Sequence, residues 1–359
     1  MSRQIGVLLL FMLSGCSTLS YYGQAVHGQA SLLLNRQSVP GLLKSSKTPS
    51  ELRARLETSQ AVLRFAEERL QLSAHGRYRS LVITGRRAVV WNVVTTPALS
   101  LAPLHWCYPI VGCLPYRGFF SEARARREAT QLRAAGKVVS VGGVPAYSTL
   151  GWFKDPLLDT FIHWPDADLA NLLFHELAHG RVWVNGDAQF NESLASFVGN
   201  AGVTQWLIDR PADLDRYLRA QTLDERFERR LAGLRKRLES VYASRAADQE
   251  KQRLADAVYA EFRRCHMAAR RDSQTSRFDA IVATGLNNAY LAGRQTYAQY
   301  EPAFAILYRD AGHQWPQFWS AVEQLIAMSK AARHQHLGDL SPDPTGASDQ
   351  HQGTDCGNY

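Results

Sequence analysis

"FHELAHGRVWVNGDAQFNES", residues 174–193, contains the pattern H-E-x-x-H at His175, Glu176 and His179. On a helix, the two histidines lie one turn apart on the same face, where their rings can hold a metal ion. The glutamate between them can then act as a base on a water bound to the metal. Two ligands do not make a catalytic site, so the surrounding residues decide what the pattern means.

The neighbours of the pattern predict a buried helix. Pro165–Asp168 offers an N-terminal cap. An apolar run follows the cap and surrounds the pattern: Leu169, Leu172, Leu173, Phe174, Leu177 and Ala178. A lone histidine in such a helix would indicate core packing, but three polar side chains cost free energy on burial unless each finds a partner. A divalent metal ion and its bound water would provide partners for all three, so we predict one metal ion there.

The third metal ligand must come from outside this helix. A histidine at the short spacing of the metzincins would fall at residue 185, which is Asn185, so that class is excluded. Asn185 and Gly186 tolerate a left-handed cap and are expected to end the helix. A second helix is expected to start near Asn191.

We select Glu192 as the third ligand, with Asp187 as the alternative. The residues one and two turns beyond Glu192 are all small: Ala195, Ser196 and Gly199. Small residues let the second helix approach the first closely enough for a carboxylate to reach the metal. Two histidines and one glutamate leave a fourth position for water, which is the catalytic arrangement of zinc.

The N-terminus resembles a bacterial lipoprotein signal. Arg3 precedes an apolar run, Ile5–Leu13, that is too short to span a bilayer as a helix. The run ends in L-S-G-C, which is similar to a lipobox in which Cys16 is lipidated. Ser17 favours the outer membrane by resemblance to known sorting signals. We therefore expect a lipid-anchored protein facing the periplasm, the alternative being an ordinary buried N-terminal helix.

In an oxidising compartment, cysteines that are close in sequence tend to form disulfides. Cys107 and Cys113 flank a segment containing Pro109 and Gly112, residues that favour a chain reversal. We expect these two cysteines to be joined, the alternative being two small buried thiols. The cysteine spacing does not suggest a second metal site.

The remaining chain reads as a mainly helical α+β protein. Periodic leucines predict a helix over residues 49–75, and "LVITGRRAVVWNVV" predicts two strands around a Gly-Arg turn. A further helix is expected over 121–135, followed by a strand broken by glycines and Pro145. From 209 to 282 charged residues are about twice as dense as in the whole chain, with apolar residues at helical spacing.

These features divide the chain into five expected regions: a signal peptide at 1–15, an N-terminal and metal-binding region at 16–208, a projecting charged helical hairpin at 209–282, C-terminal helices packing on the core at 283–333, and a disordered tail at 334–359. The tail lacks the apolar content to fold. The net charge of +8 is spread along 359 residues without a dense basic block, so nucleic acid is not an expected partner.

"HELAH" followed by "FNESLASF" is similar to the gluzincin metallopeptidases, where the third ligand lies in an N-E segment of the next helix. The chain resembles the bacterial lipoproteins known as predicted zinc aminopeptidases. The matching segments cover most of residues 21 to 300: "YYGQAVHGQ", "VVWNVVTTPALSL", "WCYPIVGCLPYRGFF", "AYSTLGWFKDPLLD", "FHELAH", "GDAQFNES" and "GLNNAYL". The resemblance implies a zincin-type core, zinc and hydrolysis of a peptide substrate. One departure is Gly199, where many members carry an acidic residue.

In zincins a strand beside the metal helix pairs with the extended substrate. "GGVPAYSTLGW" fits that position, so Gly142, Gly143 and Tyr147 are candidate substrate-strand residues, with an ordinary bulged edge strand as the alternative. An oxyanion-stabilising group should also exist. Tyr297 and His313 are candidates by residue type.

The expected function is therefore zinc-dependent peptide hydrolysis, as an aminopeptidase, with Glu176 as the general base. Two alternatives remain open. One is a hydrolase of cell-wall peptides, which the expected location allows. The other is a non-catalytic lipoprotein scaffold that uses zinc to hold helices together and the charged hairpin to dock a partner.

The lipobox interpretation can be tested at its cysteine. Replacing Cys16 with Ala removes the thiol that would carry the lipid, so the variant should leave the membrane fraction or accumulate unprocessed. Fractionation and lipid labelling of the wild type and the variant measure this. Unchanged lipid labelling in the variant would contradict a lipid anchor at Cys16.

Overall fold

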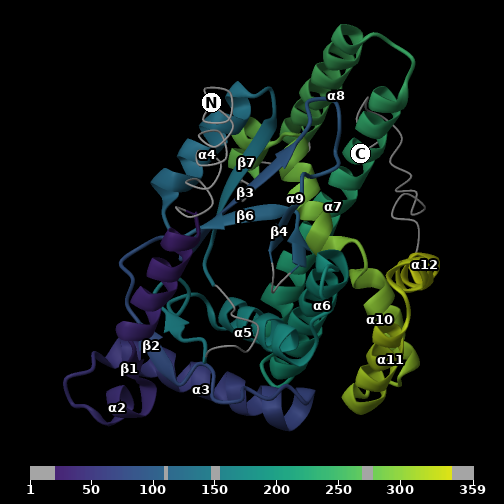
Figure 1. The fold of residues 1–359 in the computed structure, drawn as a ribbon. Helices are drawn as coiled ribbons and strands as arrows, with labels where there is room; N and C mark the ends of the chain where they lie inside the picture. The colour runs from purple at the N-terminus through teal and green to yellow at the C-terminus, as the bar shows by residue number, and fades with distance from the viewer. Residues whose placement is uncertain (1–20, 109–111, 147–153, 269–277, 342–359) are drawn as a thin grey trace, which may run out of the picture.

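The computed structural model describes residues 21–108, 112–146, 154–268 and 278–341, and within helix α9 it does not describe the side chains of 295–298. The expected signal peptide and Cys16 lie outside these residues. The fold is mainly helical with small sheets, as an α+β class requires (Figure 1). Within the described residues, no helix combines the length and the apolar character needed to cross a membrane.

A three-stranded antiparallel sheet forms the centre of the upper half of the molecule in Figure 1. Its strand order is β6-β3-β7, with bounds β3 Val90–Thr96, β6 Tyr116–Phe119 and β7 Val138–Val144. Successive residues of β3 face opposite sides. Val93 packs with α4 (Glu122–Ala134), and Val94 lies 3.4 Å from the position of a Cβ at Gly293 in α9 (Asn288–Ala298). Helices therefore cover both faces of this sheet.

A second small sheet joins the N-terminal region to the entrance of the metal helix. Its order is β1-β2-β8, with bounds β1 Gln37–Ser38, β2 Ser80–Val82 and β8 Leu157–Leu158. β2 pairs with β8 in parallel and with β1 in antiparallel orientation. The two strands expected around the Gly-Arg turn are thus β2 and β3, but they belong to different sheets and do not form a hairpin. Their partners come from distant segments, which local patterning does not reveal.

The N-terminal helices lie at the base of the molecule in Figure 1, and a short hairpin projects from the sheet region. The helices are α2 Val39–Lys44 and α3 Ser50–Leu70, and a helix over residues 21–34 precedes them. The hairpin consists of β4 Trp106–Tyr108 and β5 Gly112–Leu114. A disulfide joins Cys107 to Cys113 across it, and the hydroxyls of Tyr21 and Tyr108 are 3.1 Å apart. This disulfide therefore fastens a hairpin that contacts the first described helix through Tyr108, at the turn end of β4.

Two buried helices, α5 Asp166–Arg181 and α6 Ala188–Trp206, pack against each other and form the centre of the main core. α5 ends at Arg181, four residues before the expected stop at Asn185, because Val182 already has extended backbone. Gly186 then provides the positive φ of 75° in the turn before α6. The side chain of Asp187 caps α6 by accepting a hydrogen bond from the Phe190 amide.

The charged segment 209–282 forms two long helices that run side by side at the upper right of Figure 1, α7 Pro211–Ala243 and α8 Asp248–Ala268. A turn of the π-helix type, η1 Ile281–Gly285, follows. The two helices enclose a separate apolar core, with Phe227, Leu231, Leu234 and Leu238 on one side and Val258 and Phe262 on the other. The charged residues cover the outside of this pair.

The C-terminal layer consists of α10 Glu301–Asp310, α11 Trp315–Ala327 and α12 Lys330–Leu340. α12 contradicts the expected start of a disordered tail at residue 334, because the helix continues to Leu340. Leu337 and Arg333 are buried against the core, so tertiary contacts order a segment with low apolar content.

α10 is tied to α6 by a buried polar pair. Asn200 in α6 donates a side-chain hydrogen bond to Glu301 in α10. Burial raises the pKa of Glu301 to about 7, the charges of Glu225 and Glu228 add to this effect, and the Asn200 bond and Arg294 oppose it. The folded state therefore prefers the protonated form of Glu301 near neutral pH.

This preference predicts a pH-dependent stability. An unfolded glutamate ionises near pH 4.5, so the folded protein binds the extra proton between that pH and about 7, and the free energy of unfolding falls as pH rises through this window. The full effect is about 3 kcal/mol. Glu301→Gln keeps an acceptor for Asn200 and cannot ionise. In urea titrations the variant should match the wild type near pH 4 and exceed it at pH 8. Parallel stability curves for the two proteins would contradict this account.

Candidate metal centre

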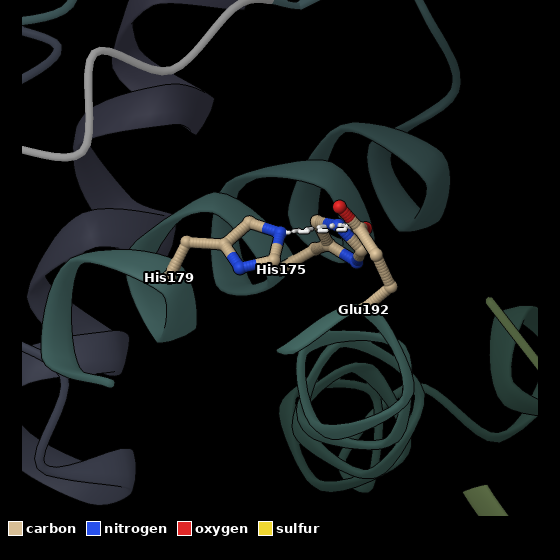
Figure 2. Close-up of side chains that lie close together, drawn as sticks. All are labelled: His175, His179 and Glu192. Atoms are coloured by element: carbon tan, nitrogen blue, oxygen red, sulfur yellow. Dashed lines mark hydrogen bonds and ion pairs between the residues drawn. The ribbon is translucent and has the colours of Figure 1, made fainter. Parts of the chain in front are cut away.

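Three possible metal donors meet where α5 and α6 cross. His175 and His179 extend from one face of α5, and the carboxylate of Glu192 reaches them from the beginning of α6 (Figure 2). The Nε2 atoms of the two histidines are 3.1 Å apart. Glu192 Oε2 lies 3.4 Å from the first and 3.5 Å from the second. The structure therefore brings together the three residues selected from the sequence.

The spacing of the three donor atoms fits a tetrahedral metal site. A zinc ion with ligands at about 2.0–2.1 Å has neighbouring ligand atoms about 3.3 Å apart. The three measured separations, 3.1, 3.4 and 3.5 Å, lie close to this value. Among the residues that the structure describes, the donor group has three members. The arrangement can thus hold a divalent metal ion and leave a position for another ligand.

The neighbouring histidines keep the Glu192 side chain in a form suited to metal binding. The Glu192 side chain is 7% exposed, which by itself would raise its pKa, yet the two histidines lower the pKa to about 2. Burial would by itself lower the pKa of His179, but the charge and hydrogen bond of Glu192 raise it. Glu192 is therefore a carboxylate at all moderate pH values, as a metal ligand must be.

Glu176 lies beside the donors and differs from them. It is half-buried, and desolvation together with the charges of Glu192 and Asp155 raises its pKa, while the two histidines oppose the shift. A raised pKa makes a carboxylate a better proton acceptor. The neighbourhood thus contains one carboxylate whose pKa is lowered and a second whose pKa is raised.

The close crossing of α5 and α6 depends on small residues. A Cβ at Gly199 would lie 3.1 Å from the Asn171 carbonyl oxygen, and one at Gly202 would lie 2.7 Å from the Phe174 ring. Gly199, the position where the family resemblance leads us to expect an acidic residue, therefore packs directly on the backbone of α5. The glycine lets the two helices approach each other.

Asp187, the alternative ligand, has other partners. Its carboxylate is 1% exposed and contacts Arg333 at 2.7 Å and His334 at 2.7 Å, both on α12. Glu192, five positions further along the chain, faces the histidines. The two carboxylates thus have separate environments although they are close in the sequence.

The sequence reasoning missed a cluster on the other side of α5. Arg77 is 3% exposed, donates a hydrogen bond to the Glu176 carbonyl at 3.3 Å, and lies where a Cβ at Gly180 would be, 2.1 Å from its nitrogens. Tyr78 follows it, and the Tyr78 amide donates to the Asp155 carbonyl at 2.7 Å. These residues lie far from the metal motif in the sequence, so the motif offered no signal for them.

Tyr78 has two unusual properties. Its φ is 61°, in the left-handed region that a bulky residue rarely adopts. Its side chain is 3% exposed, so the surrounding protein encloses the phenol ring. Burial and the charges of Glu176 and Asp155 raise its pKa well above the ordinary value, so the hydroxyl remains a donor at neutral pH.

The other candidates from the sequence are placed as follows. Gly142 and Gly143 are exposed near the end of β7, which among the described strands pairs only with β3. Their pairing with a substrate stays a prediction, and Tyr147 lies outside the described residues, as does the side chain of Tyr297. His313 packs against Tyr308 beyond α10. Trp315, two residues further on, donates a hydrogen bond to Gln205 near the C-terminal end of α6, whereas Glu192 lies near the N-terminal end.

The fold and site define a mainly helical α+β protein with a buried His-His-Glu group that can bind a metal ion. A family model described as "Putative aminopeptidase" matches residues 20–337. The chain therefore belongs to this aminopeptidase family, and membership suggests peptidase activity. No curated protein and no solved structure matches the chain.

Proposed function

We propose that this protein is a zinc-dependent metallopeptidase, and specifically an aminopeptidase. The observation that carries the proposal is the convergence of His175, His179 and Glu192 beside the half-buried Glu176. Membership of the aminopeptidase family supports the substrate class. A structural zinc site normally has four protein ligands, so a group of three favours catalysis over a scaffold role.

Zinc is the metal that best fits the donor chemistry. Two imidazole nitrogens and one carboxylate form a ligand set used by catalytic zinc, with the donor spacing that tetrahedral coordination needs. Harder ions such as magnesium prefer oxygen ligands. When bound, zinc lowers the pKa of a water ligand and polarises the substrate carbonyl.

Glu176 would perform the proton transfers. Its carboxylate would take a proton from the attacking water and pass that proton to the nitrogen of the leaving amine. Its own backbone is held by Arg77, which donates to the Glu176 carbonyl. The backbone of the proposed base is therefore anchored to a buried cation from a segment distant in the sequence.

The Tyr78 hydroxyl would donate a hydrogen bond to the substrate oxygen on which negative charge develops. Its uncommon backbone conformation supports this role, because strained residues often cluster at functional sites. The charges of Glu176 and Asp155 raise the pKa of Tyr78, so Tyr78 lies in the same neighbourhood as the proposed base.

We further propose that the protein is lipid-anchored through Cys16 and faces the periplasm, at the outer membrane because Ser17 follows the cysteine. The apolar run before Cys16 and the Cys107–Cys113 disulfide both suit an exported protein. The peptide substrate would then be one that reaches this compartment, and a cell-wall peptide is the second candidate because of that location.

The decisive change is Glu176→Gln, which keeps size and hydrogen bonding but cannot take a proton. The variant should fold and bind zinc like the wild type, while turnover of peptides with a free amino terminus falls by at least about a hundredfold. Metal analysis and peptide turnover measure the two effects separately. His179→Ala is the control, since it should lose zinc and activity together.

Equal turnover in the wild type and Glu176→Gln would end the peptidase proposal. A wild type that binds zinc fully but cleaves no peptide in a broad library would favour the scaffold instead. Preference for blocked over free amino termini would reject the aminopeptidase assignment and retain a peptidase.

Tyr78→Phe tests the second proposed catalytic group. It removes only the hydroxyl, so folding and zinc content should be unchanged, and kcat should fall by roughly a hundredfold, the usual loss for one oxyanion donor. Tyr259→Phe is a matched control, because its hydroxyl bonds Asn288 in the separate core of α7 and α8. Wild-type kcat in Tyr78→Phe would exclude this role.

A further inference from the structure

The connection between α5 and α6, residues 182–187, is held by side chains of α12. Arg333 donates to Asp187 Oδ2 through Nε at 3.0 Å and through Nη2 at 2.7 Å. His334 Nε2 lies 2.7 Å from Asp187 Oδ1. Both oxygens of a carboxylate that is 1% exposed are therefore occupied by a helix near the C-terminus.

Arg333 is itself fixed in place. Its Nη1 donates to the carbonyls of Leu325 at 3.4 Å and Met328 at 3.1 Å, at the end of α11. The guanidinium also lies over the ring of Phe190, 5.0 Å from its centroid. With 3% exposure and partners on α6, α11 and the Asp187 carboxylate, Arg333 is a rigid cross-link.

Other contacts act on the same connection. Lys330 Nζ donates to the Gly186 carbonyl at 2.8 Å, also from α12. From α6, the side chain of Asn191 bonds both the amide and the carbonyl of Val184, at 2.8 and 2.9 Å. A Cβ at Gly112, in the disulfide-bonded hairpin, would meet Asn185 at 2.3 Å. The connection is therefore packed from several directions.

The position of this connection matters for the metal donors. Asp187 caps α6, and Glu192 lies about one and a half turns further along the same helix. A shift or rotation of the beginning of α6 would move the Glu192 carboxylate relative to the two histidines on α5. The donor separations near 3.4 Å leave little tolerance for such a movement.

We propose that Arg333, with His334, positions Glu192 for metal binding by holding Asp187, so that α12 is a functional part of the metal centre. Arg333, His334 and Asp187 are positioning residues and touch neither metal nor substrate. The proposal rests on the metal-binding half of the proposed function and is independent of peptide hydrolysis.

The test measures the zinc affinity of the full chain by competition with a chromophoric chelator. Arg333→Met removes the cross-link with similar side-chain length, and Asp187→Asn removes the charge it holds. Each should weaken zinc binding by about 10- to 100-fold, the usual loss when a residue supporting a ligand is removed. Glu192→Gln, which changes the ligand itself, should weaken it more.

A matched control separates positioning from general stability. Arg237→Met breaks the paired hydrogen bonds, at 2.8 and 2.6 Å, that join Arg237 to Glu261 between α7 and α8, away from the donors. It should lower the thermal stability of the zinc-free chain and leave zinc affinity at the wild-type value. The double variant Asp187→Asn with Arg333→Met should lose no more affinity than one single variant, because the two residues act as one unit.

His334→Asn covers the case in which Arg333→Met does not fold, since it removes one contact of a half-buried residue and should reduce zinc affinity several-fold. Wild-type affinity in this variant and in Arg333→Met or Asp187→Asn would overturn the proposal. Loss of zinc in Asp187→Asn with normal affinity in Arg333→Met would also overturn it, because Asp187 would then be a ligand. A wild type without zinc affinity would reject both proposals, whereas zinc binding without peptidase activity would reject the catalytic one alone.

Discussion

The close crossing of α5 and α6 is the constraint on which the rest of the site depends. The Glu192 carboxylate of α6 comes within 3.4 and 3.5 Å of the two histidines of α5 because the facing positions carry small residues. At Gly199 and Gly202 even one added carbon would meet the neighbouring helix. The same approach buries three polar side chains, whose desolvation must be offset by mutual contacts and by a bound metal ion.

Two buried arginines support this crossing, one through contacts with α5 and the other through contacts with the beginning of α6. Arg77 donates to the carbonyl of Glu176 and fills the space beside Gly180, so it acts on α5. Arg333 holds the capping carboxylate Asp187, so it acts on the beginning of α6. Each comes from a segment distant in sequence, one N-terminal and one C-terminal to the metal motif. Segments that precede and follow α5 and α6 in the sequence therefore both contribute to the alignment of these two helices.

The surroundings of the site follow from the same architecture. Tyr78 and Asp155 lie just before the paired strands β2 and β8. The charges of Glu176 and Asp155 raise the pKa of Tyr78, so Tyr78 lies near the proposed base Glu176. The disulfide-bonded hairpin lies against the turn before α6. Helices α7 and α8 have their own apolar core and do not supply donors to the metal centre among the residues described. The candidate metal centre and the charged pair of helices α7 and α8 thus occupy separate parts of the molecule.

The sequence by itself determined the buried helix α5 and the spacing of His175, Glu176 and His179, because these depend on local spacing and helical period. It also indicated Glu192, since the small residues after it share one helical face. Strand pairing, the order of α12 and the contacts of Arg77, Tyr78 and Arg333 were decided only by the tertiary structure. Those features arise from contacts between segments far apart in the chain, and neither periodicity nor motif spacing records which distant side chains will meet.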